Sequence, residues 1–155
     1  MAGSTTSGSA DGTGPAASFN NPNGLAVDGS GNVYVADTFN HMIRKITSAG
    51  VVTTVAGSTT SGSADGTGAA ASFFRPYAVA IDASGNLYVA DCNNNMIRKI
   101  DSAGVVTTLA GSTTAGHADG TGTAASFNSP GAVAADGSGN LYVADSGNNM
   151  IRKIV

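Results

Sequence analysis

The chain has 155 residues, of which 41% are hydrophobic and 11% are charged, and it contains 22 glycines and no glutamate. This length suits one domain, and no apolar run approaches the roughly 20 residues that a membrane-spanning helix needs. The net charge of −3 argues against a general nucleic-acid binder, and a single cysteine, Cys92, excludes an internal disulfide.

A repeat of 54 residues organises the sequence. Ala2-Gly3-Ser4 returns at Ala56 and again at Ala110, and many other residues keep the same step. We therefore treat residues 1–155 as one unit built from the repeats 2–55, 56–109 and 110–155, the last of which is incomplete. About three-quarters of the positions agree between the first two copies. Such similarity indicates recent duplication or deliberate engineering.

Within each copy the hydrophobic pattern has a period of two, which is typical of β-strands. In chain order, the first copy predicts strands over residues 25–27, 33–36, 42–46 and 51–55, separated by turns rich in Asp, Gly, Ser and Asn. Four antiparallel strands joined by tight turns form a meander. A four-stranded meander repeated every 40–55 residues is typical of a β-propeller, so we predict an all-β chain with three blades.

A long polar segment, such as residues 57–72, precedes the next blade. We interpret it as a connector between blades, held in place by an aromatic residue that packs between them. The alternative is a functional loop, since long loops often are. The aromatic residues in question are Phe19, Phe73 and Phe127.

Several motifs resemble the NHL repeat. They are Asn23–Asp28, Gly31–Asp37 and Asn40–Ile46, and the second and third copies repeat Tyr-Val-Ala-Asp and Ile-Arg-Lys-Ile at the matching positions. The resemblance covers nearly the whole chain and is closest to bacterial NHL arrays. It implies a propeller that usually has six blades around a central channel, and an exported or cell-surface bacterial parent. Because Met1–Ser4 lacks the features of a signal peptide, the sequence itself leaves the compartment open.

Most charges recur in every copy, which favours a structural role. An aspartate ends the second predicted strand and is placed to accept turn N–H groups or to pair with a nearby arginine. The residues of this series are Asp37, Asp91 and Asp145, with Arg44, Arg98 and Arg152.

The residue pattern gives little support for metal binding or catalysis. Asp28, Ser30 and Asn32 have the spacing that begins a calcium loop, but the later positions of that motif do not match. The loops at Asp11, Asp65 and Asp119 are a second candidate cation site. His41 and His117 occupy unrelated repeat positions, and a catalytic zinc generally needs three protein ligands. We therefore expect no metal, no cofactor and no catalytic residue, and we interpret Cys92 as a small turn residue.

Departures from the repeat concentrate in two connections that emerge on the same face of a propeller blade. Binding residues gather on such loops, so we predict a binding face at the channel mouth, against the alternative of neutral drift. Its candidate residues are Asn20, Asn21, Asn23, Phe39, His41, Phe74, Arg75, Tyr77 and Asn128.

Three functions remain open. The leading one is a non-catalytic, self-assembling scaffold; the second is a protein- or glycan-binding module of an exported bacterial protein; the third is a propeller lyase or lactonase. Three blades leave apolar faces at both ends, and two chains supply the six blades that the resemblance implies. We therefore expect a homodimer that closes one six-bladed ring, with no nucleic-acid or membrane partner.

Overall fold

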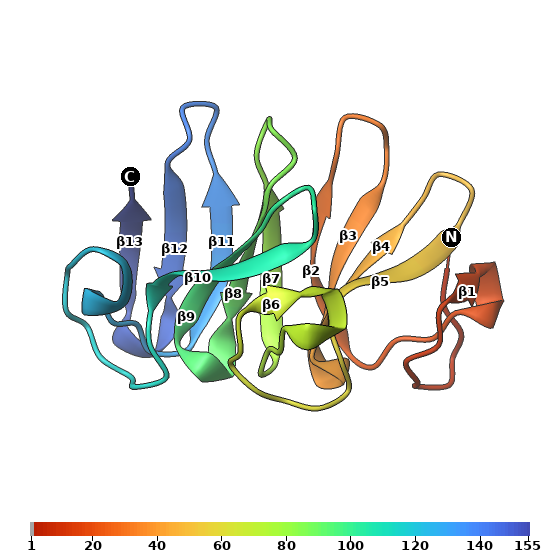
Figure 1. Cartoon of the computed structure of the whole chain (residues 1–155), viewed down its shortest axis with the longest axis horizontal. Helices are drawn as coiled ribbons and strands as arrows, with labels where there is room; N and C mark the ends of the chain where they lie inside the picture. The colour runs from red at the N-terminus through yellow and green to blue at the C-terminus, as the bar shows by residue number, and fades with distance from the viewer. Residues whose placement is uncertain (1) are drawn as a thin grey trace.

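The computed structural model describes residues 2–155 and is all-β, with three sheets side by side and the two termini at opposite ends (Figure 1). The first sheet contains β1 (Gly12–Thr13), β2 (Pro22–Val27), β3 (Val33–Asp37), β4 (Met42–Ile46) and β5 (Val51–Gly57). The second contains β6 (Gly66–Thr67), β7 (Pro76–Ile81), β8 (Leu87–Asp91), β9 (Met96–Ile100) and β10 (Val105–Gly111). The third contains β11 (Pro130–Ala135), β12 (Leu141–Asp145) and β13 (Met150–Ile154). Among residues 2–155, no helix is long and apolar enough to cross a bilayer.

Each sheet is an antiparallel meander, as the alternating pattern predicted, but the strand number differs from four. The first two sheets run in the order β1-β5-β4-β3-β2 and β6-β10-β9-β8-β7. The extra strand comes from the polar segment that precedes the blade: Gly12 lies opposite Val52, and Gly66 lies opposite Val106. A strand of two residues is too short to show a hydrophobic pattern in the sequence. Its extended backbone depends on pairing with β5 or β10.

The core lies between neighbouring sheets. Ala36 and Ile43 of the first sheet share one buried cluster with Val79, Leu87 and Val89 of the second. A second cluster joins the second and third sheets in the same way. Repeat units of this kind bury their apolar faces against their neighbours, so each internal face is covered.

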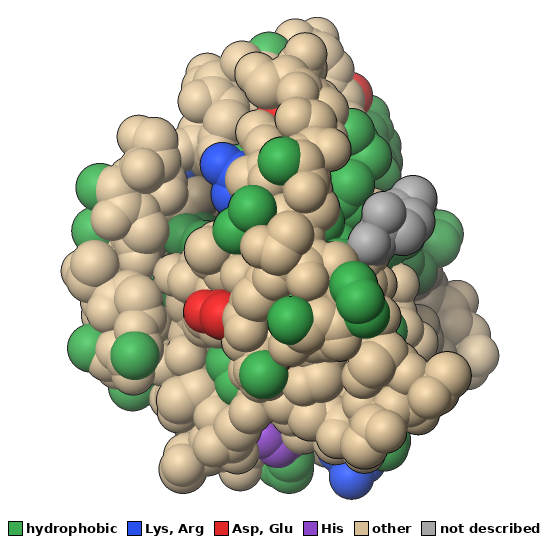
Figure 2. All heavy atoms as spheres, turned by 90° about the vertical axis from the view of Figure 1, so that its right-hand side faces the viewer, with side chains coloured by type: hydrophobic (Ala, Val, Ile, Leu, Met, Phe, Trp, Pro, Cys, Tyr) green, Lys and Arg blue, Asp and Glu red, His purple; other side chains and the backbone are tan. Residues whose placement is uncertain are grey.

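The two end faces of the chain stay exposed. On the first sheet, Leu25 and Val27 are 61% and 60% exposed, and on the third sheet Ile151 is 76% exposed. Figure 2 looks at the end of the molecule that carries the first sheet and shows hydrophobic side chains on its surface among polar ones. The repeat therefore leaves at each end a surface of the kind that it buries inside.

The turn between β2 and β3 uses its aspartate as an internal cap. Asp28 accepts hydrogen bonds from the backbone N–H groups of Ser30 and Asn32, both at 2.9 Å, and from the Asn32 side chain at 2.8 Å. The bond from the Asn32 side chain is the main cause that lowers the pKa of Asp28. Both carboxylate oxygens are thus committed to the turn, which explains the spacing that the calcium interpretation rested on.

Candidate functional site

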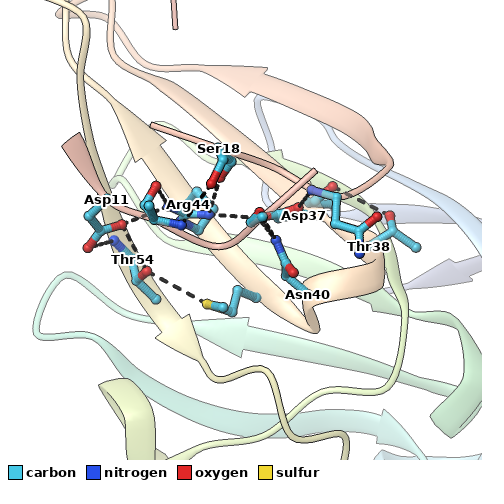
Figure 3. A network of polar contacts seen from close by, with 12 residues as sticks. Asp11, Ser18, Asp37, Thr38, Asn40, Arg44 and Thr54 are labelled. Carbon is cyan, nitrogen blue, oxygen red and sulfur yellow. Dashed lines mark hydrogen bonds and ion pairs between the residues drawn. The ribbon is translucent and has the colours of Figure 1, made fainter. Parts of the chain in front are cut away.

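A buried arginine ties the polar segment to each blade. Arg44, on β4, is fully buried and reaches across the blade (Figure 3). Its Nη1 donates to Asp37 at 2.7 Å and to the Ser18 carbonyl at 3.2 Å. Its Nη2 donates to Asp11 at 2.8 Å and to the Ala10 carbonyl at 2.9 Å. We call this unit of one arginine between two aspartates the arginine clasp.

The carboxylates of the clasp bind further parts of the blade. Asp37 accepts from the Asn20 backbone N–H and from the Asn40 side chain, both at 2.8 Å, while Asp11 accepts from the Thr54 hydroxyl at 3.1 Å. Equivalent clasps join Arg98 to Asp65 and Asp91, and Arg152 to Asp119 and Asp145. The residues of the candidate cation loops therefore bind a guanidinium group.

An aromatic ring covers each clasp. The arginine Cζ lies 5.1 Å from the ring centre of Phe19, 5.3 Å from that of Phe73 and 5.2 Å from that of Phe127 in the three blades. Phe73 and Phe127 are buried, whereas Phe19 is half-buried at the open end of the chain. Each ring thus packs on the guanidinium group of its own blade as well as holding the loop.

The candidate binding face gathers four predicted residues at the boundary of the first two blades. The Arg75 guanidinium lies 4.8 Å from the centre of the Phe39 ring, and the Arg75 backbone N–H donates to His41 Nδ1 at 3.0 Å. The rings of His41 and Phe74 meet edge-to-face at 5.7 Å. His41 and Arg75 both have positive φ angles, 58° and 52°, a conformation that is uncommon for residues other than glycine.

The other predicted residues lie around this cluster or one blade further along. Tyr77 is 40% exposed on β7, two residues after Arg75 in the chain. The Asn20 backbone is held by Asp37, and the Asn23 side chain donates to Thr38 Oγ1 at 2.9 Å and to the Asn21 carbonyl at 3.2 Å. Asn128 lies in the third repeat, where its side chain donates to the Gly147 carbonyl at 3.4 Å.

The candidate binding face differs from the clasps in that its arginine is not ion-paired within the part of the chain that the structure describes. Burial, together with the charge of Arg75, lowers the pKa of His41, so its ring is neutral at pH 7 and free to accept the Arg75 N–H. Among the residues that the structure describes, Arg75 has no carboxylate within ion-pair distance. Arg75 is therefore a cation whose guanidinium donors are available to a ligand.

The remaining nucleophile and metal-ligand candidates stay apart. Burial raises the pKa of the Cys92 thiol, which opposes the thiolate form that a nucleophile needs. Within residues 2–155, no three His, Cys, Asp or Glu side chains are grouped so that they could hold a metal ion. Sequence reasoning missed the pairing of Asp11 with Arg44, which are 33 residues apart, and the bond between His41 and Arg75, which are 34 apart.

The meanders, the shared cores between them and the repeated clasp define a propeller-type repeat protein. The model of the teneurin NHL domain matches residues 4–70 and 61–120, and the model of the NHL repeat matches residues 127–154. The chain belongs to the NHL-repeat family, which confirms the resemblance drawn from the sequence.

Known proteins share this fold over part of their length. The chain is 37% identical, over 95 residues, to Protein SUPPRESSOR OF QUENCHING 1, chloroplastic, of Arabidopsis thaliana, a match that covers 61% of this chain and 9% of that protein. A solved structure of a Bacteroides thetaiotaomicron protein of unknown function is 34% identical with a TM-score of 0.74, over 79% of this chain and 32% of that one. The solved structure of an auxiliary nutrient binding protein from Bacteroides ovatus has a TM-score of 0.78 at 23% identity, over 92% of this chain and 39% of that one. The chain thus spans a small part of the curated relative and about a third of each solved structure.

Proposed function

We propose that the chain is a non-catalytic scaffold that assembles by closing two copies into one six-bladed propeller. The observation that carries this proposal is the equivalence of its exposed ends to its buried interior. Leu25 occupies the repeat position of Val79, which is 4% exposed, and Ile151 occupies that of Ile97, which is fully buried. Each exposed end face therefore corresponds to a face that a neighbouring blade buries inside the chain. This favours a head-to-tail contact between the first blade of one copy and the third blade of the other, made twice in a closed pair.

Polar contacts between blades support the same arrangement. At the first boundary His41 Nδ1 accepts from the Arg75 N–H, and at the second boundary Asn95 Oδ1 accepts from the Ser129 N–H at 2.9 Å. The next members of this series are Asn149 and Asn21, at opposite ends of the chain. We expect Asn149 of one copy to accept from the Asn21 N–H of the second copy.

The assembly is tested by the mass in solution. Light scattering should give about 30 kDa, twice the 15.1 kDa of one chain. Ile151→Asp should give the single-chain mass, because it places a charge in the seam, where an unpaired charge is costly. Val51→Asp is the matched control, since Val51 lies on β5, which pairs with β1 and β4 within the first sheet, and Val51 is 36% exposed. A wild-type mass of one chain would contradict the proposal, and a trimer would contradict the six-bladed ring.

A second function, binding of a protein or glycan at the channel mouth, is favoured by Arg75. Its guanidinium lies on the Phe39 ring without a carboxylate partner within the described chain. Phe74 and Tyr77, close to Arg75 in the chain, are 37% and 40% exposed. Guanidinium groups bind carboxylates through two parallel hydrogen bonds, and exposed rings add contact area. This combination suits a ligand that carries a carboxylate. The likeness in fold to Bacteroides proteins named as nutrient binding agrees with a binding role and with an exported protein.

This binding role can be tested on an array of uronate-containing oligosaccharides and on a cell-lysate pull-down. Arg75→Ala and Tyr77→Ala should each reduce capture about tenfold or more, a loss typical of a central contact residue. Tyr142→Ala is the matched control, because Tyr142 has the same 40% exposure on a different blade. Capture that is unchanged in the Arg75 and Tyr77 variants would contradict a binding site at this face.

A further inference from the structure

An open groove runs along the edge of the third sheet. Within residues 2–155, β13 pairs with β12 on one side and has no strand on the other. The groove has a volume of about 460 Å³ and lies between β13, the end of β10 and residues 119–127. Its walls include Leu109, Ala110, Asp119, Phe127 and Arg152.

In the first two sheets a strand fills the equivalent space. There β10 lies between β9 and β6, with Thr108 opposite Arg98 on one side and Val106 opposite Gly66 on the other. The counterpart of Gly66 in the third repeat is Gly120, which forms no strand because it has no such neighbour. The groove is therefore bordered by unpaired backbone on both sides, a form of edge that accepts an added strand.

Among the described residues, the side chain of Asp119 at the groove lacks the threonine partner that its counterparts in the first two blades have. Thr108 donates its hydroxyl to Asp65 at 3.0 Å, and Thr54 donates to Asp11 at 3.1 Å. The side chains of Asp65 and Asp11 are 51% and 48% exposed, whereas that of Asp119 is 96% exposed. The difference reflects the covering that β5 and β10 supply and that Asp119 lacks.

We propose that this groove is a binding site for an extended peptide of the Val-Val-Thr-Thr type, which would add as the fourth strand of the third blade. Backbone hydrogen bonds to β13 and to residues 120–121 would supply affinity. Specificity would come from a valine directed inward, as Val106 is buried in the second sheet, and from a threonine hydroxyl that donates to Asp119.

The inference rests on the third blade alone and does not depend on the proposed assembly. In a closed pair, Ala2 and Gly3 of the second copy occupy the repeat positions of Ala110 and Gly111, which lie opposite Ile97 and Met96. That contact would reach only Ile151 and Met150, and it leaves the threonine position beside Asp119 unfilled.

The test uses the full chain and a fluorescein-labelled peptide with the sequence of residues 102–108, Ser-Ala-Gly-Val-Val-Thr-Thr, which stops before the positions that Ala2 and Gly3 of a second copy would occupy. Fluorescence anisotropy should show saturable binding that a scrambled peptide lacks. Asp119→Asn should weaken binding about tenfold, since it removes the charge from a hydrogen bond. The matched control is Asp65→Asn, the same change in the second blade, where β10 already fills the space.

A peptide variant makes the test independent of the folding of the protein variants. Replacing the second threonine of the peptide by valine should weaken binding to the wild-type chain to a similar degree, and should add little to the effect of Asp119→Asn. Equal effects of Asp119→Asn and Asp65→Asn, equal binding of the scrambled peptide, or the absence of saturable binding would overturn the inference. Masses measured on the same samples separate the proposals. A dimer that binds no peptide contradicts only the groove, and a monomer that binds it contradicts only the ring.

Discussion

Arg98→Met should lower the free energy of unfolding by about 3–5 kcal/mol, the usual cost of removing one partner of a buried ion pair. Arg98 and Asp91 are both fully buried, 2.9 Å apart, so the substitution leaves the Asp91 carboxylate without its charge partner in the interior. It also removes the bonds from Nη2 to Asp65 and to the Ala64 carbonyl, which anchor the polar segment. Urea unfolding monitored by circular dichroism measures the loss.

Lys99→Met is the control for this experiment. Lys99 follows Arg98 on the same strand, but its side chain is on the opposite face and only half-buried. We expect it to cost less than about 1 kcal/mol, as for other surface substitutions. The double variant Arg98→Met with Asp91→Asn should recover part of the stability, because the second change removes the unpaired charge. Equal losses for Arg98→Met and Lys99→Met would contradict the role given to the clasp.

Phe73→Ala should cost about 3–5 kcal/mol, the range for truncating a buried phenylalanine. Phe73 is fully buried, contacts the Arg98 guanidinium and belongs to the cluster that joins the first two sheets. Its truncation would therefore open a cavity and loosen the polar segment at once. Thermal melting should show a clear drop in the midpoint temperature.

Phe39→Ala provides the comparison for Phe73. Phe39 is 42% exposed in the turn η2 (Thr38–Asn40), and no other repeat has a phenylalanine at that position. We expect its truncation to cost less than about 1 kcal/mol. Comparable melting losses for Phe39→Ala and Phe73→Ala would contradict the distinction drawn here between a buried and an exposed phenylalanine.

The long strands could be predicted because their signals are local. The prediction over residues 42–46 coincides with β4. The prediction over residues 51–55 lies within β5, since all five residues there are β-branched. By contrast, β1 and β6 consist of Gly-Thr pairs, and their extended form depends on a neighbour about 40 residues away in the chain. The expectation of four strands in every blade was therefore too simple for the first two sheets.

The candidate site also has a part that was predictable from local sequence and a part that was not. The face that holds Phe39, His41, Phe74 and Arg75 was predictable in position, because its connections depart from the repeat and propeller topology brings such connections together. The stacking of Arg75 on Phe39 was not predictable, since it depends on the left-handed backbone at Arg75, a conformation that a non-glycine residue seldom signals in sequence. The pairing of Asp37 with Arg44 was among the predicted roles of that aspartate, and the structure has it. The second clasp partner was hidden, because one sequence alone does not pair Asp11 with Arg44 rather than with another basic residue.

Every arginine clasp is contained within one polar segment and the blade that follows it. In the second blade, the residues from Gly62 to Thr108 supply all of its charges and hydrogen-bonding partners. A 54-residue duplication therefore copies a complete electrostatic unit, and a deletion removes one, without leaving a buried ion unpaired elsewhere. Arrays of such blades can gain or lose members during evolution at the cost of the contacts between neighbouring blades, which are apolar packing and a few hydrogen bonds. Near-identical neighbouring copies supply these contacts again.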